Sequence, residues 1–195
     1  IRKSDRMSIS YSGPFEPNGG TFQDCIIIKT LKFLGLDNNL KLNIKINKNI
    51  PVQGGLGSAS TNAAALIKGL DVMHLIKKKN PEKYVELGSD IPCFLFEKNC
   101  LVTGIGERLN YQFFPKYYFL LVKPKFNNST KDMYNKLDYD ILTRDQISFF
   151  DENQINLDDS GNDFEKNLYK ENIEFQKIFE FLDCLKDAVF YRMTG

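Results

Sequence analysis

The sequence predicts an α+β protein in two domains, which we place at residues 1–114 and 115–195. Three observations carry this prediction. LKLNIKI at 40–46 alternates apolar and polar residues, as a half-buried strand does. Asn62–Leu75 follows a glycine-rich loop and is typical of a helix in both length and composition. The run YYFLLVKP after Pro115 is apolar over the length of a buried strand, and it marks the start of the second domain.

The other elements of the first domain follow in chain order. Residues 22–34 have apolar side chains at helical spacing, and Gly35 is a residue type that commonly ends helices. DIPCFLF at 90–96 predicts a strand or an extended entry to one. NCLVTGIGERL at 99–109 predicts another strand and a turn.

In the second domain, residues 127–163 are polar and rich in Asn and Asp, and they contain a predicted short helix at 130–137. Helical spacing returns at 164–186. The composition is that of a globular protein, with 42% hydrophobic and 26% charged residues and a net charge of +1. A near-neutral chain without a basic stripe argues against a nucleic-acid partner, and no apolar run approaches the ~18 residues of a membrane span.

Cysteine and histidine usage argues against a metal site of the usual Cys/His kind. The four cysteines form no C-x-x-C pair, and the chain has one histidine, His74. We expect reduced thiols. The cysteines are Cys25, Cys93, Cys100 and Cys184.

The glycine-rich loop PVQGGLGSASTNAAA at 51–65 predicts an anion site between strand and helix. Glycines let the backbone approach a phosphate closely, and first-turn amides of the following helix lack partners within it. The residues expected to cradle phosphate oxygens are Gly54, Gly55, Gly57, Ser58 and Ser60. The loop has neither the G-K-[ST] of a Walker A sequence nor G-x-G-x-x-G. The alternative is a turn that only connects the two elements.

The same loop resembles the phosphate loop of the GHMP small-molecule kinases, P-x-x-x-G-L-G-S-S-A-A. Within that superfamily it is most similar to the 4-diphosphocytidyl-2-C-methyl-D-erythritol kinases, which read IP-x-x-x-GLGGGSSNAA. Thr61–Ala64 fits the Ser-Asn-Ala-Ala segment, whereas Ser58 and Ala59 stand where the family has glycine. Further blocks resemble the family in the same order: LGSDIPCFL (87–95), LVTGIGERL (101–109), KPKFNNSTKDMYNKL (123–137), GNDFE (161–165) and RMTG (192–195).

The resemblance implies the two-domain GHMP kinase fold, with an N-terminal domain like domain 2 of ribosomal protein S5 and a ferredoxin-like α/β sandwich. It implies ATP-dependent phosphorylation of the 2-hydroxyl of 4-diphosphocytidyl-2-C-methyl-D-erythritol, in non-mevalonate isoprenoid synthesis. Magnesium is implied by the ATP chemistry, and no protein ligand for it is assigned. The resemblance extends the nucleotide-binding set to Leu56, Ala59, Thr61 and Asn62.

Four more site residues come from the resemblance, each with an alternative. Asp90 matches the family's catalytic aspartate, which would accept the alcohol's proton; otherwise it is a turn or cap residue. Lys48 would frame the adenine end through its backbone, or is a surface lysine. Thr130 would line the methylerythritol and diphosphate side of the site. Tyr134 would stack on cytosine, or is a core aromatic.

The resemblance also marks what the printed sequence lacks. The family pairs its aspartate with a lysine in a P-A-K-I-N segment and holds cytosine with G-Y-H, and neither motif occurs here. We therefore expect a fragment with half of the catalytic pair. The alternatives are another GHMP kinase, of the homoserine or mevalonate type, or a degenerate nucleotide-binding relative. We expect a soluble protein with a small-molecule substrate, in a bacterial cytoplasm or a plastid or apicoplast stroma, and leave its oligomeric state open.

Overall fold

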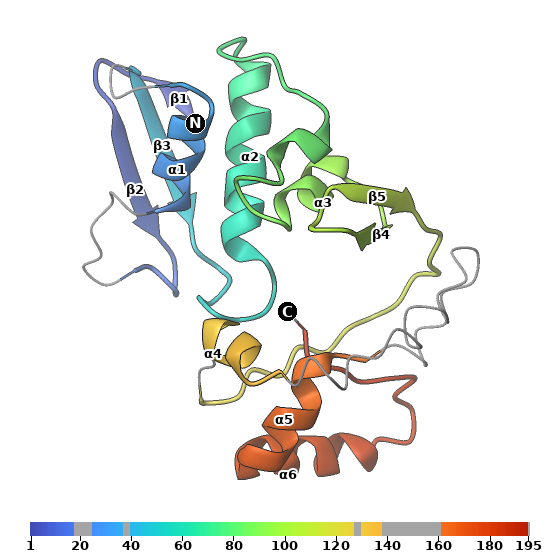
Figure 1. The fold of residues 1–195 in the computed structure, drawn as a ribbon. Helices are drawn as coiled ribbons and strands as arrows, with labels where there is room; N and C mark the ends of the chain where they lie inside the picture. The colour runs from blue at the N-terminus through green and yellow to red at the C-terminus, as the bar shows by residue number, and fades with distance from the viewer. Residues whose placement is uncertain (18–24, 37–39, 127–129, 138–160, 195) are drawn as a thin grey trace. The chain divides into compact units, whose positions relative to one another are not determined.

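The computed structural model of the chain divides into two compact units (Figure 1). Unit 1 comprises Ile1–Val52 and Gly57–Lys116, and unit 2 comprises Gln53–Leu56 and Tyr117–Gly195. The structure describes residues 1–17, 25–36, 40–126, 130–137 and 161–194. None of the helices in these ranges is long and apolar enough to cross a membrane.

A three-stranded sheet forms one side of unit 1, in the order β1-β3-β2. β3 (Leu42–Asn47) pairs antiparallel with β1 (Arg2–Lys3) and parallel with β2 (Ser8–Ser12). The strand predicted at 40–46 is therefore confirmed. Its apolar side chains Leu42, Ile44 and Ile46 are buried, because alternate residues of a strand face the same side of the sheet.

Two helices bury their apolar faces against this sheet. α1 (Ile26–Phe33) contributes Ile27 and Leu31, and α2 (Ser58–Val72) contributes Leu66 and Leu70. Both predicted helices are confirmed, although residues 22–24 of the first lie outside the described residues, and α2 begins four residues before Asn62. Ser58–Thr61 are therefore helical and not part of the loop.

The opposite face of α2 packs against a second core, which corrects one prediction. Ala63, Ala64 and Ile67 contact Tyr84, from the 3-10 helix η2 (Pro81–Tyr84), and α3 (Ile91–Phe96). The segment 90–96 was expected to be extended, and it is a helix. Pro92 lies in the first turn, where no amide hydrogen is needed, and Ile91 and Leu95 lie one turn apart on the buried face.

A hairpin follows α3. β4 (Cys100–Thr103) pairs antiparallel with β5 (Arg108–Tyr111), with Thr103 opposite Arg108. The predicted strand and turn are confirmed, and a second strand is added. The turn is held by Glu107, whose carboxylate accepts a hydrogen bond of 2.8 Å from the Ile105 amide. A hydrogen bond from the amide of Glu107 itself, and then this bond from Ile105, keep the pKa of Glu107 below its usual value.

The described part of unit 2 is helical. It contains α4 (Thr130–Asn135), α5 (Asp163–Glu171) and α6 (Ile173–Asp183), which confirms the helices predicted at 130–137 and 164–186. Asn172 divides the second region into two helices because it adopts an extended backbone and caps α6. The core of this unit is Met133, Leu168 and Phe175.

The strand predicted at YYFLLVKP is wrong. Residues 117–124 have no regular structure, and the apolar side chains of 118–122 face solvent, with Tyr118 89% and Leu120 78% exposed. A strand is stabilised by ladder hydrogen bonds to a neighbouring strand. Unit 2 has no strand among the residues that the structure describes, so this segment has no such neighbour there.

Candidate functional site

The N-terminus of α2 offers a row of backbone donors. Gly57 is the N-cap residue in a left-handed conformation, φ +59°, and no side chain caps the helix. In the part of the chain that the structure describes, the amides of residues 54–60 donate no hydrogen bond. Because the helix dipole adds positive potential at this end, and the first turn holds no acidic residue, the site suits an anion.

Lys48 supplies a cation at the same helix terminus. It is 8% exposed, and its Nζ donates to Ser58 Oγ, the first residue of α2, at 3.1 Å. Burial lowers the pKa of this lysine. Its backbone is engaged inside unit 1, since its amide donates to the Ser12 carbonyl at 2.7 Å and its carbonyl accepts from the Phe15 amide at 3.2 Å. The side chain of Lys48 is therefore directed at the first residue of α2.

The polar residues of the first turn divide into two groups. Thr61 donates its hydroxyl to the Gly57 carbonyl at 3.0 Å, so this side chain stabilises the helix start. Ser58 and Ser60 are half-buried and Ala59 is exposed. The serine hydroxyls can therefore add side-chain donors to the row of amides, whereas Ala59 can contribute only its backbone.

Asp90 lies at the start of α3, and Phe94 links that helix to the glycine loop. A methyl group added at Gly57 would lie 2.7 Å from ring carbons of Phe94, so the two residues are in close contact. The Phe94 amide donates to the Asp90 carbonyl, which places the two residues one turn apart. The carboxylate of Asp90 is exposed and caps no amide.

α3 is held firmly on α2. Ile91 is completely buried, and Lys68 donates from α2 to the Phe94 carbonyl at 2.9 Å. Lys68 also pairs with Glu97 at 2.7 Å. On the other side, a methyl group added at Gly106 of the hairpin turn would lie 2.1 Å from the Ser89 carbonyl oxygen. The residue before Asp90 is therefore in contact with the hairpin.

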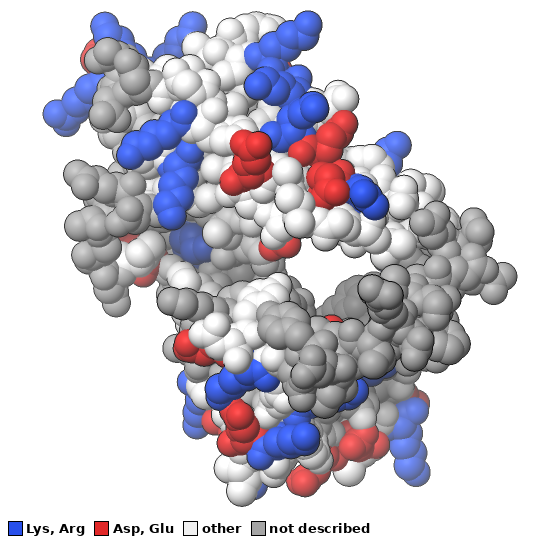
Figure 2. Space-filling model, in the orientation of Figure 1, with Lys and Arg blue, Asp and Glu red and all other residues white. Residues whose placement is uncertain are grey.

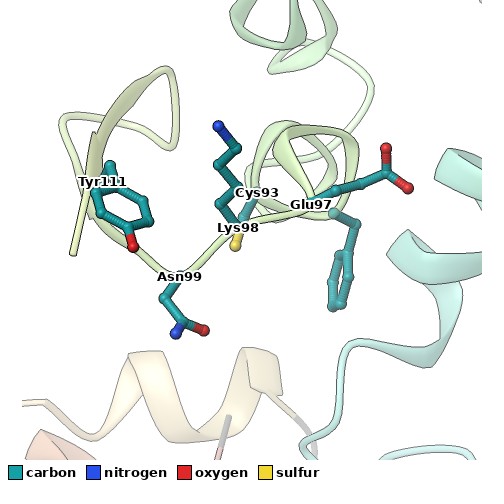
Figure 3. A pocket seen from close by; sticks show the side chains of 6 residues that line it. Cys93, Glu97, Lys98, Asn99 and Tyr111 are labelled. Carbon is teal, nitrogen blue, oxygen red and sulfur yellow. The ribbon is translucent and has the colours of Figure 1, made fainter. Parts of the chain in front are cut away.

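An open pocket of about 510 Å³ lies beside the C-terminal half of α3 (Figure 3). Cys93 and Tyr111 lie on opposite sides of it (Figure 3). It contains neither Asp90 nor a residue of the glycine loop. Its lining residues are Cys93, Phe94, Glu97, Lys98, Asn99 and Tyr111.

In unit 2, α4 presents the residues expected on the acceptor side. Met133 is buried in the core, and the next residue, Tyr134, is 52% exposed. The Tyr134 ring meets Phe164 edge-to-face, with centroids 5.1 Å apart. Thr130 is the first residue of α4, and its side chain lies outside the described part of the chain.

Two of the sequence blocks meet in unit 2. Asn162 caps α5 through the Phe164 amide at 3.0 Å and donates from its amide nitrogen to the Met193 carbonyl at 3.1 Å. Glu165 accepts from the Met193 amide. Thr194 then donates its hydroxyl to the Gly55 carbonyl at 2.9 Å. The GNDFE block thus holds Met193 of the RMTG block, a contact that no local sequence pattern predicts.

Among the described residues, no three His, Cys, Asp or Glu side chains come close enough to hold a metal ion. On the face shown in Figure 2, Lys and Arg side chains of both units are interrupted by acidic or uncharged residues. Anion binding at the glycine loop would therefore depend on the local donors described above and not on a general positive surface.

The chain is similar to several known proteins. The family "GHMP kinases N terminal domain" matches residues 25–98. A 4-diphosphocytidyl-2-C-methyl-D-erythritol kinase of Pelagibacter ubique is 33% identical over 199 aligned positions, which cover 96% of this chain and 68% of the relative. A protein of the same name from Francisella tularensis subsp. holarctica is 32% identical over 179 residues, covering 89% of this chain and 62% of the relative.

A solved structure is also similar. The crystal structure of a 4-(cytidine 5'-diphospho)-2C-methyl-D-erythritol kinase matches with a TM-score of 0.60 and 17% identity, over 91% of this chain and 65% of that chain. This likeness supports the predicted α+β fold. The chain spans about 62% of the length of the Francisella relatives.

Proposed function

This chain belongs to the family of 4-diphosphocytidyl-2-C-methyl-D-erythritol kinases, and from that premise we propose that the protein transfers the γ-phosphoryl group of ATP to the 2-hydroxyl of 4-diphosphocytidyl-2-C-methyl-D-erythritol. The observation that carries the proposal is the pairing of two features in unit 1. The first amides of α2 donate to no residue that the structure describes, and the exposed Asp90 begins α3, with Phe94 and Gly57 in contact between them.

The glycine loop would bind the ATP phosphates. The amides of residues 54–60 would donate to phosphate oxygens, and Ser58 and Ser60 would add hydroxyl donors. The Lys48 ammonium, already directed at Ser58, would pair with a phosphate oxygen through a charge-assisted hydrogen bond. Phosphoryl transfer depends chiefly on positioning the phosphates and neutralising their charge, and these groups would supply both.

Asp90 would act as the base. As the substrate's 2-hydroxyl oxygen bonds to the γ-phosphorus, the carboxylate would accept the hydroxyl proton, and ADP would leave. The chemistry requires an accessible oxygen acceptor, and the Asp90 side chain, which is exposed and caps no amide of α3, meets that need.

On the acceptor side, Tyr134 would stack on cytosine, and Thr130 would line the methylerythritol and diphosphate portion. The 52% exposure of Tyr134 supports this role, because stacking on a base requires an aromatic side chain that solvent reaches. Magnesium would be held mainly by ATP oxygens, as is usual for this ion. We assign no protein ligand to it.

The test compares Asp90→Asn with the control Asp5→Asn, an exposed carboxylate outside the helices, in the purified protein with Mg-ATP and the cytidyl substrate. Phosphorus NMR follows the phosphorylated product. We expect D90N to lower kcat by about 10²–10⁴-fold while ATP affinity is retained. Full activity of D90N would remove Asp90 from this role. Turnover of homoserine or mevalonate in place of the cytidyl substrate would assign a different kinase of the superfamily.

A further inference from the structure

Two cysteines on different secondary-structure elements lie side by side in unit 1. Cys93 is on α3, Cys100 begins β4, and their sulfur atoms are 3.7 Å apart. Both side chains are half-buried. Cys93 also lines the open pocket beside α3 (Figure 3), so at least one of the two sulfurs can be approached from solvent. The phosphoryl transfer proposed above uses neither thiol.

We propose that Cys93 and Cys100 form a thiol–disulfide exchange site that reacts reversibly with a low-molecular-weight disulfide such as oxidised glutathione. In the first step, the Cys93 thiolate attacks one sulfur of the disulfide. A mixed disulfide forms on Cys93 and one glutathione thiolate leaves. In the second step, Cys100 loses its proton to solvent and its sulfur attacks Cys93 Sγ. The second glutathione thiolate leaves, so two protein thiols are oxidised and one glutathione disulfide is reduced to two thiols.

The environment of the pair assigns the order of the two steps. Burial, and then the contact with Cys93, raises the pKa of Cys100 to about 11, so Cys100 stays protonated at neutral pH. A thiol is nucleophilic as the thiolate, and access to the incoming disulfide also limits the rate. Cys93 faces the pocket and is therefore the attacking residue, whereas Cys100 resolves the mixed disulfide.

The surrounding structure allows the bond to close. Bonded sulfurs are about 2.05 Å apart, so the two atoms must approach by roughly 1.6 Å. Lys68 and the buried Ile91 hold α3 on α2, so the hairpin that carries Cys100 must make most of the movement. The connecting residues 97–99 are exposed and are not packed in a core, and the contacts given for them are the Lys68–Glu97 pair and the bond from the Gln112 amide to the Asn99 carbonyl.

Formation of this disulfide would also change the position of Asp90. The hairpin that carries Cys100 contacts Ser89 through Gly106, immediately before Asp90. A shift of the hairpin toward α3 would therefore displace the start of that helix and lower phosphoryl transfer. This consequence rests on the proposed kinase function, whereas the exchange chemistry itself does not.

The experiment uses the full chain, treated with increasing oxidised glutathione and then mapped by peptide mass spectrometry. The exposed Cys184 serves as the internal control, and the reagent is raised until Cys184 carries glutathione. We expect a peptide pair linked through Cys93 and Cys100 that has lost two hydrogen atoms and is restored by dithiothreitol. Cys100→Ser should trap glutathione on Cys93, and Cys93→Ser should leave Cys100 unmodified.

Free thiols at both positions while Cys184 is modified would overturn the proposal, as would separate glutathione adducts on Cys93 and Cys100 without a link. Kinase activity is measured on the same samples. Loss of activity on oxidation, restored by dithiothreitol and absent in Cys100→Ala, would support the effect on Asp90. A linked protein that is inactive even when reduced would count against the proposed kinase function and leave the exchange site standing.

Discussion

Replacing Gly57 by alanine tests the contact that joins the glycine loop to α3. Two costs are expected. A side chain at φ +59° costs about 1 kcal/mol, and the new methyl group would lie 2.7 Å from the Phe94 ring. Displacing a packed ring costs typically about 1–3 kcal/mol. We therefore expect Gly57→Ala to lower the free energy of unfolding by about 2–4 kcal/mol, measured by urea denaturation.

Gly35→Ala is the matched control. Gly35 also has a left-handed conformation, φ +69°, but a methyl group there meets nothing within 4 Å. It should cost about 1 kcal/mol from the backbone alone. In the Phe94→Ala background, Gly57→Ala should cost little more than Gly35→Ala, because the clashing ring is gone. Equal losses for Gly57→Ala and Gly35→Ala in the otherwise unchanged protein would refute the reasoning.

Three further predictions concern single side chains. Lys48→Met should weaken ATP binding about 10–100-fold in calorimetry, because a charge-assisted hydrogen bond contributes about 1.5–3 kcal/mol. Lys45→Met, at an exposed position, should leave the affinity for ATP unchanged. Asn172→Ala removes one helix cap and should lower the free energy of unfolding by about 1 kcal/mol in urea denaturation. Asn162→Ala should lower it more, because this variant loses a cap and also the hydrogen bond to the Met193 carbonyl. Equal losses would contradict a stabilising role for the Asn162–Met193 bond. The pKa of Glu107 is lowered in the folded protein, so the carboxylate stabilises the fold above the unfolded pKa of 4.5, and this stabilisation is lost as the pH falls through the folded pKa. Glu107→Gln should therefore flatten the acid dependence of the free energy of unfolding. Glu86→Gln, at an exposed position, should not.

The elements that the sequence predicted correctly are those whose side-chain period matches their burial. β3 alternates and buries Leu42, Ile44 and Ile46 against helices, so its pattern and its packing agree. The segment 90–96 is short and apolar, and such runs fit a strand or a buried helix equally well. Packing against α2 decided in favour of the helix. The apolar run at 117–124 predicts a strand by its length alone, and length does not show whether a neighbouring strand is present.

The residue types of the candidate site could be predicted from the sequence, but the neighbouring residues that hold them in place could not. The glycine-rich loop before a helix indicated an anion site, and a sequence block indicated Asp90. The roles of Phe94, Lys68 and Gly106 depend on contacts between segments separated in the chain, which no local pattern encodes. The same holds for the two thiols, since Cys93 and Cys100 are separated by a helix end and a strand start that had first to be assigned.

The uncapped start of α2 has a practical consequence for anyone handling this protein. Amides that donate to nothing within the described chain exchange their hydrogens with solvent rapidly, so residues 54–60 should be among the least protected positions in deuterium-labelling experiments without ligand. An anion bound there would supply the missing acceptors and slow the exchange. Sulfate or phosphate in a purification buffer would then stiffen this turn by itself, and nucleotide titrations made in such buffers would report competition in place of simple binding.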